Sequence, residues 1–192
     1  MPVRPVRPVR PEAAYGMRSD PPRLRAGAPG PTPGQPAKDA AMAKIPAFSL
    51  PGSDGRLHTA KEMLGSRWVL YFYPKDDTPG CTTEACDFRD SLVTRAAQKA
   101  GWQVIGVSPD SVKRHTSFIA KHQLPFLLLA DEKHVLAEKL GVWALKTNYG
   151  REYMGIVRST FLVGPDLAIL HAWRQVKVKG HAEEVLAALA AE

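Results

Sequence analysis

The chain has 192 residues, of which 44% are hydrophobic, and a formal net charge of +7 at pH 7. This length suits one well-buried core of roughly 150 residues preceded by a tail. Because the chain has only two cysteines and no apolar stretch long enough to span a membrane, we expect a reducing, cytoplasmic location and no membrane partner.

Residues 1–41 differ in composition from the rest and form the first predicted segment. They hold ten of the 17 prolines, so we expect an extended or disordered tail, with residues 42–192 as the folded domain. The tail carries +4 of the net charge but has neither the apolar core of a secretory signal nor the helix of a mitochondrial presequence. The plainest hypothesis is a misassigned start upstream of Met42. A basic arm for nucleic acid or another acidic surface, and a plastid transit segment, are the alternatives.

The domain begins with a predicted β-hairpin and a short helix. Residues 48–50 and 56–58 flank a turn at 52–55, and residues 59–62 fit a capping box.

Residues 68–73 are continuously aromatic and β-branched, as is typical of a strand buried on both faces. Pro74 and the run 78–80 break this strand, and a helix follows. Thr78 suits the N-cap and Pro79 the first helical position, which places Cys81 in the first turn. Unpaired N–H groups and the helix dipole favour an anion there, and a thiolate is such an anion.

The two cysteines, Cys81 and Cys86, lie five residues apart in this predicted helix. Cys81 shares an apolar stripe with Ala85, Phe88 and Leu92, so its thiol should face the sheet. In a regular helix the two Cα atoms are roughly 8.7 Å apart, whereas disulfides rarely span more than about 7 Å. The spacing therefore favours a pair that bonds only when the helix unwinds. A structural disulfide and two unrelated core cysteines are the alternatives.

The remaining elements alternate between strand and helix. Strands are predicted at 103–107, 126–129, 158–163 and 168–173, and helices at 111–122, 132–140 and 181–190, with an irregular stretch at 146–154. This order predicts an α/β domain with an open sheet covered on both sides. Arg158 interrupts the mostly apolar run that predicts the strand at 158–163. A buried arginine needs a partner or an anionic site, and the alternative is a solvated position at the edge of the sheet.

Several of these motifs together resemble a known family. Residues 73–75, 81–86, 141–143 and 158–162 closely resemble the peroxiredoxins of the bacterioferritin comigratory protein (PrxQ) subfamily, over residues 45–192. The peroxiredoxin signature of Pro, three residues, Thr, two residues and Cys is met by Pro74, Thr78 and Cys81, and a second cysteine at Cys86 marks the subfamily. Ala47 departs from the family, which usually has an acidic residue there.

The resemblance implies a thioredoxin-like fold with a central mixed sheet flanked by helices and an added N-terminal hairpin. It implies a thiol peroxidase in which Cys81 attacks a hydroperoxide and becomes a sulfenic acid, which Cys86 resolves as an intramolecular disulfide. A thioredoxin-type or glutaredoxin-type reductant would reopen the disulfide. Arg158 and Thr78 would hold the thiolate and the peroxide, and Pro74 would close the pocket.

No cofactor or metal is expected, because the six histidines show no ligand spacing and there is no phosphate-binding loop. We expect a monomer without a nucleic-acid partner. Glu84 is interpreted as a residue of the helix surface or a modulator of the thiol pKa. Two other functions stay open: a redox-sensing binding protein, and a general thiol-disulfide oxidoreductase, although the latter usually carries Cys-x-x-Cys.

Overall fold

The computed structural model describes residues 44–91, 101–148 and 150–191. The predicted tail at 1–41, the hypothetical start at Met42 and the stripe residue Leu92 lie outside these ranges.

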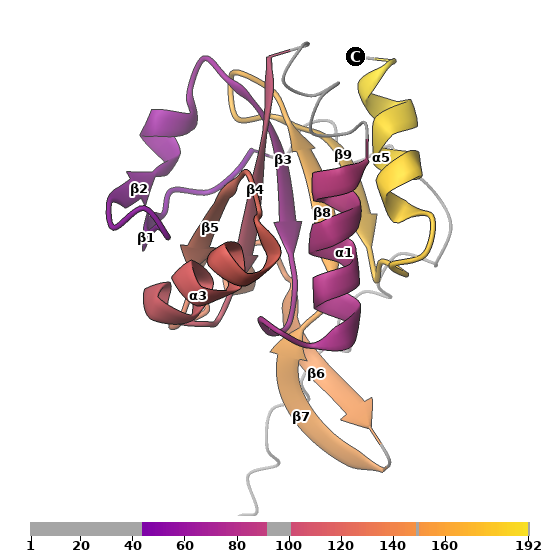
Figure 1. The fold of residues 1–192 in the computed structure, drawn as a ribbon. Coiled ribbons are helices and arrows are strands. Elements are labelled where there is room, and N and C mark those ends of the chain that lie inside the picture. Colours follow the sequence, from indigo (N-terminus) through magenta and orange to yellow (C-terminus); the bar gives the residue numbers. More distant parts are fainter. Residues whose placement is uncertain (1–43, 92–100, 149, 192) are drawn as a thin grey trace, which may run out of the picture. The chain divides into compact units, whose positions relative to one another are not determined.

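A five-stranded mixed sheet forms the centre of the domain, with the strand order β5-β4-β3-β8-β9 (Figure 1). Its strands are β3 (Arg67–Phe72), β4 (Trp102–Ser108), β5 (Leu127–Ala130), β8 (Ser159–Val163) and β9 (Ile169–Arg174). The pairs β3–β4 and β4–β5 are parallel, whereas β8 runs antiparallel to both β3 and β9. The predicted α/β class with a central mixed sheet is confirmed.

Three helices cover one face of this sheet: α1 (Pro79–Asp90), α3 (Val112–His122) and α5 (His181–Leu189) (Figure 1). They pack on strand residues that point to this side and exclude water from them. The buried side chains of this layer include Tyr71, Tyr73, Cys81, Phe88, Trp102, Phe118, Leu128 and Val185. The thiol of Cys81 therefore belongs to the core that lies under α1, as the apolar stripe predicted.

The opposite face is covered by smaller elements. These are the hairpin of β1 (Ser49–Pro51) and β2 (Leu57–Thr59), the 3₁₀ helix η2 (Ala60–Met63) and α4 (Val135–Lys139). The hairpin is confirmed, and Glu62 accepts a hydrogen bond from the Thr59 N–H at 3.1 Å, as a capping box requires.

Three details of the predicted elements are wrong. The stretch expected to be irregular forms a hairpin of β6 (Trp143–Asn148) and β7 (Arg151–Ile156), and Arg158 lies in the short connection between β7 and β8 instead of in a strand. Helix α4 is also shorter than predicted, because His134 adopts a left-handed backbone with φ of 57°. The carboxylate of Asp131 then accepts the N–H groups of Leu136 and Ala137 at 3.0 and 2.9 Å.

Candidate active site around Cys81

The first turn of α1 positions Cys81 at the end of strand β3. Thr78 occupies the N-cap position and Pro79 the first helical position, as predicted. The Thr78 hydroxyl, however, donates to the carbonyl of Lys75 at 3.0 Å and makes no side-chain hydrogen bond to the helix. Cys81 is buried, with 2% of its surface exposed. The thiol thus sits in the first turn of α1, where the N–H groups have no partner within the helix.

Arg158 meets the buried thiol from the connection before β8. Its Nη2 atom donates to the Sγ atom of Cys81 at 3.1 Å, although 77 residues separate the two in sequence. Its Nη1 atom donates to the Oε2 atom of Glu84. One guanidinium therefore bridges the thiol and a carboxylate of the same helix.

Of the two interpretations of Glu84, the surface residue is wrong, and the modulator of the thiol pKa stays a prediction. Only 2% of Glu84 is exposed, and burial raises the pKa of its carboxyl to about 7, with the nearby charge of Arg158 acting in the opposite direction. Its Oε1 atom has no hydrogen-bond partner among the described residues. The burial of Glu84 and its contact with Arg158 are the features of the site that the sequence did not predict.

Cys86 lies about 1.4 turns after Cys81 in the same helix and is half-buried, and both thiols are free. Because α1 runs continuously from Pro79 to Asp90, the helical separation of roughly 8.7 Å applies to the two Cα atoms. A disulfide between them requires part of α1 to unwind.

Pro74 and Thr78 lie at the two ends of the loop that connects β3 to α1, and both are half-buried. The structure thus places four of the five sequence-predicted site residues on the loop and α1, and the fifth, Arg158, against the helix. The loop also contains Asp76, which is 2% exposed. The sequence did not predict its hydrogen-bond network, because Asp110 and His115 lie far from Asp76 in the chain.

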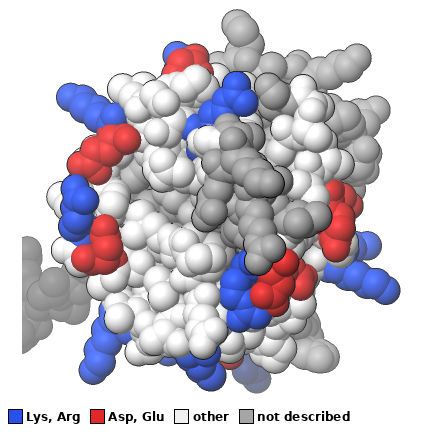
Figure 2. All heavy atoms as spheres, turned by 45° about the horizontal axis from the view of Figure 1, so that its top comes forward, with Lys and Arg blue, Asp and Glu red and all other residues white. Residues whose placement is uncertain are grey.

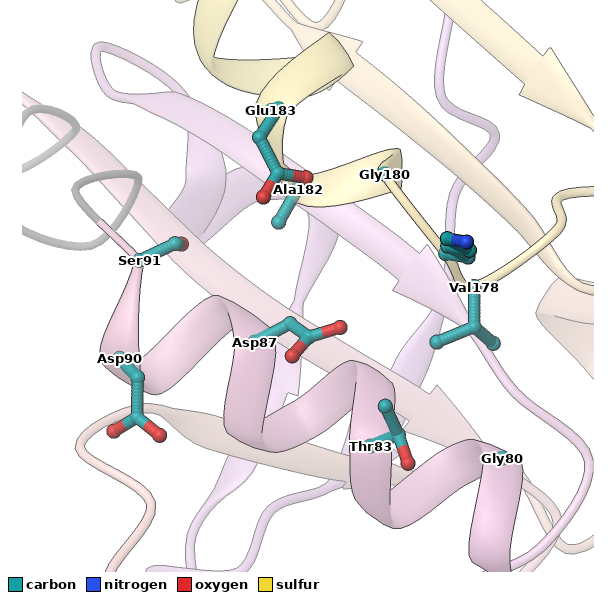
Figure 3. A pocket seen from close by; sticks show the side chains of 10 residues that line it. Gly80, Thr83, Asp87, Asp90, Ser91, Val178, Gly180, Ala182 and Glu183 are labelled. Atoms are coloured by element: carbon teal, nitrogen blue, oxygen red, sulfur yellow. The ribbon is translucent and has the colours of Figure 1, made fainter.

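A hollow near the site lies on the outer side of α1, facing the start of α5. Figure 3 shows Thr83 and Asp87 of α1 opposite Glu183 of α5. Neither Cys81 nor Arg158 lines this hollow. Partial burial, with the like charges of Glu183 and Asp90, raises the pKa of the Asp87 carboxyl.

Charged side chains are interspersed at the surface. On the face shown in Figure 2, basic and acidic residues alternate around the rim, and neither sign forms a broad patch among the described residues. No helix within the described ranges is long and apolar enough to cross a membrane. In the same ranges, no cluster of three or more His, Cys, Asp or Glu side chains is arranged to hold a metal ion.

Comparison with known proteins finds relatives that match most of this chain. The model of the AhpC/TSA family matches residues 41–172. Peroxiredoxin Bcp of Bacillus subtilis is 53% identical over 146 residues, which cover 76% of this chain and 92% of that protein. The structure of peroxiredoxin Q of Xanthomonas campestris is similar with a TM-score of 0.74 at 44% identity, covering 80% of this chain and 98% of that one.

A second similar structure is that of the bacterioferritin comigratory protein of Xanthomonas campestris, for which alkyl peroxide reduction activity is described. It has a TM-score of 0.70 and 46% identity, and the match covers 75% of this chain and 90% of that one.

Proposed function

The chain belongs to the AhpC/TSA family as a peroxiredoxin of the bacterioferritin comigratory type, and we propose that it reduces hydroperoxides through Cys81, with Cys86 as the resolving thiol. The contact between Arg158 and the buried Cys81 thiol is the observation that carries this proposal. The guanidinium lies 3.1 Å from the sulfur and has further N–H groups that can donate to an oxygen atom of the peroxide.

The first step is attack of the Cys81 thiolate on one oxygen of the hydroperoxide. A sulfur–oxygen bond forms as the oxygen–oxygen bond breaks, and the leaving alkoxide or hydroxide takes up a proton to become alcohol or water. Arg158 stabilises the negative charge on the leaving oxygen, a kind of contribution worth about 100- to 1000-fold in rate. Thr78 helps to hold the peroxide, and Pro74 limits the access of water.

The larger part of the rate must come from such fixed donors. Lowering a thiol pKa from about 8.5 to about 6 raises the thiolate fraction at pH 7 roughly thirty-fold, but it also weakens the nucleophile by about ten-fold. The few-fold net gain is small beside the contribution of Arg158. Arg158 contacts both Cys81 and Glu84, and these two contacts hold its guanidinium in a fixed position beside the sulfur.

The second step is attack of the Cys86 thiolate on the sulfur of the Cys81 sulfenic acid. The disulfide bond forms as the sulfur–oxygen bond breaks, and the hydroxide that leaves takes up a proton to become water. Unwinding of α1 brings the two sulfur atoms together. A dithiol reductant of the thioredoxin or glutaredoxin type then reduces the disulfide to two thiols by exchange and is itself oxidised.

A monomer in the reducing cytoplasm suits this cycle, because the resolving cysteine comes from the same chain and neither step uses a partner subunit. A general thiol-disulfide oxidoreductase is less consistent with the site, since such an enzyme does not need a guanidinium held against its nucleophile. A peroxide sensor would share the site, but it would react once and stop.

Peroxide turnover coupled to NADPH through thioredoxin and its reductase tests the proposal. We expect wild type to turn over and Cys81→Ser to be inactive. Cys86→Ser should react once and then stall as the sulfenic acid. Failure of Cys81 to oxidise in wild type would overturn the peroxidase proposal, whereas rapid oxidation without turnover by any dithiol reductant would favour the sensor.

A further inference from the structure

The loop between β3 and α1 contains a peptide group that is held on both sides. Its N–H, that of Asp76, donates to the Oδ2 atom of Asp110 at 2.7 Å. Its carbonyl, that of Lys75, accepts the hydroxyl of Thr78 at 3.0 Å. The orientation of the Thr78 hydroxyl is therefore tied to the plane of the Lys75–Asp76 peptide.

Asp110 is itself fixed at the end of β4. The Ser108 hydroxyl donates to its Oδ2 atom at 3.0 Å, and the Nε atom of Arg114 contacts its Oδ1 atom at 2.8 Å. Only 9% of Asp110 is exposed. A carboxylate with both oxygens engaged has little freedom to release the Asp76 N–H.

The side chain of Asp76 is held from the opposite direction. Its Oδ1 atom accepts the Tyr73 hydroxyl at 2.7 Å, and its Oδ2 atom lies 2.8 Å from the Nδ1 atom of His115. The Nε2 atom of His115 lies 3.2 Å from the Leu129 carbonyl oxygen. His115, which has no exposed surface, thus links the loop to the core strand β5.

A second link between α3 and the loop provides a comparison. Asp77, next to Asp76, has a left-handed backbone with φ of 58°, and its Oδ1 atom contacts Lys121 and His122 at 3.0 and 3.1 Å. This link is exposed to water and should be weak, whereas the links through Asp110 and His115 are buried.

We propose that Asp110 and His115 are positioning residues, which act through the Lys75–Asp76 peptide to aim the oxygen of Thr78 at the peroxide bound beside Cys81. This inference rests on the proposed peroxidase function. The Thr78 hydroxyl donates its proton to the Lys75 carbonyl, so its oxygen can only accept a hydrogen bond from the bound peroxide. An acceptor there suits the O–H group of a hydroperoxide.

The geometry explains why neither residue needs to touch the substrate. If the peptide rotates, the Thr78 hydroxyl loses its acceptor and is free to turn its own proton toward the thiol. Displacement of a substrate-positioning group by about 1 Å can cost up to about 100-fold in rate. The network therefore affects the reaction with peroxide more than the general reactivity of the thiol.

The test compares two reactions of Cys81 in Asp110→Ala and His115→Gln. The rate constant with hydrogen peroxide should fall about ten-fold, because Thr78 loses its orientation. Alkylation by iodoacetamide, which uses no peroxide acceptor, should stay within about two-fold of wild type. Asp110→Asn retains an acceptor oxygen for the Asp76 N–H and should recover most of the peroxide rate. Lys121→Gln, which removes an exposed contact of the same loop, should match wild type in both reactions.

A double-variant cycle tests whether Asp110 affects the peroxide rate through Thr78. In a Thr78→Val background, adding Asp110→Ala should cost no further peroxide rate, because the group that it positions is already gone. Additive losses, or an equal fall in both reactions, would overturn the inference while leaving the peroxidase function in place. If Asp110→Ala does not fold, the same cycle with His115→Gln decides. A wild-type Cys81 that does not react with peroxide would overturn the function and this inference together.

Discussion

At the scale of single residues, the site depends on how one guanidinium is shared. Arg158 donates to the Cys81 sulfur with one nitrogen and to the Glu84 carboxylate with the other. The carboxylate fixes the arginine, but Glu84 is itself buried, and burial raises its pKa to about 7. Its protonation state therefore changes within the range in which the protein is expected to work.

This titration predicts a pH-dependent stability. Between about 4.5, the usual pKa, and about 7, the folded protein retains a proton that the unfolded chain has already released. Stability contributed by Glu84 is therefore present at low pH and is lost as the pH rises through this window. Glu84→Gln should remove that dependence. Relative to wild type, its free energy of unfolding should rise by up to about 3 kcal/mol from pH 4.5 to pH 8.

Urea unfolding of the reduced protein at several pH values measures this difference. Glu138→Gln, at an exposed position of α4, is the matched control and should follow wild type throughout. Parallel pH profiles for Glu84→Gln and wild type would contradict the prediction.

The sequence predicted the site residues whose roles depend on their neighbours in the chain, but not the contacts between distant residues. Cys81, Thr78 and Pro79 are close together in the chain, and the strand-to-helix junction around them could be read directly. Glu84 contacts a residue 74 positions away, and the Asp76–His115 pair spans 39 positions. No nearby residue signals such partners, so the sequence leaves Glu84 open between a surface residue and a modulator of the thiol pKa.

At the scale of elements, helix α1 has two opposing tasks. As a folded helix it holds Cys81 against Arg158, and as an unwound segment it lets Cys86 reach the sulfenic acid. Thr83 lies between the two cysteines on the exposed side of the helix, where its hydroxyl donates to the Pro79 carbonyl at 3.0 Å. Changes at Thr83 can therefore alter helix stability without altering the thiols.

Two variants at this position should differ in the rate of disulfide formation. Thr83→Ala and Thr83→Gly both lose the hydroxyl, but glycine is less favourable in a helix by about 1 kcal/mol. If unwinding limits the second step, Thr83→Gly should form the disulfide about five-fold faster than Thr83→Ala. Rapid-quench mass spectrometry after one equivalent of peroxide measures both rates.

The same pair of substitutions in another helix is the control for effects that do not depend on α1. Ser117 lies on the exposed side of α3, and its hydroxyl bonds the Lys113 carbonyl in the same way. Its Ala and Gly variants should form the disulfide at equal rates. Equal rates for the Thr83 pair would mean that α1 does not unwind in the limiting step.

Element types were predicted well where the pattern reflects burial. Strand β3 and the hairpin of β1 and β2 follow their sequence signals closely. The hairpin of β6 and β7 was missed because it exposes Leu145, Tyr153 and Met154, so apolar and polar side chains do not alternate as they do in a half-buried strand. Its pairing comes from the backbone and not from a buried face.

At the scale of the whole molecule, the described fold begins at Lys44. The N–H of Ile45 donates to the Leu167 carbonyl at 2.9 Å, and Lys44 pairs with Ala168 beside β9. Ile45 and Phe48 are 4% and 7% exposed and belong to the core on the side of η2 and α4. The segment from Lys44 to Phe48 is thus part of the domain.

Two shortened chains should separate this segment from residues 1–41. A chain that starts at Met42 keeps both core residues, so its melting temperature and peroxide turnover should match those of the full chain. A chain that starts at Ser49 loses the burial of Ile45 and Phe48 and should be less stable by about 4 kcal/mol. Thermal unfolding and coupled turnover of the three chains measure these effects. A loss of turnover in the chain starting at Met42 would instead assign residues 1–41 a part in the reaction or in binding the reductant.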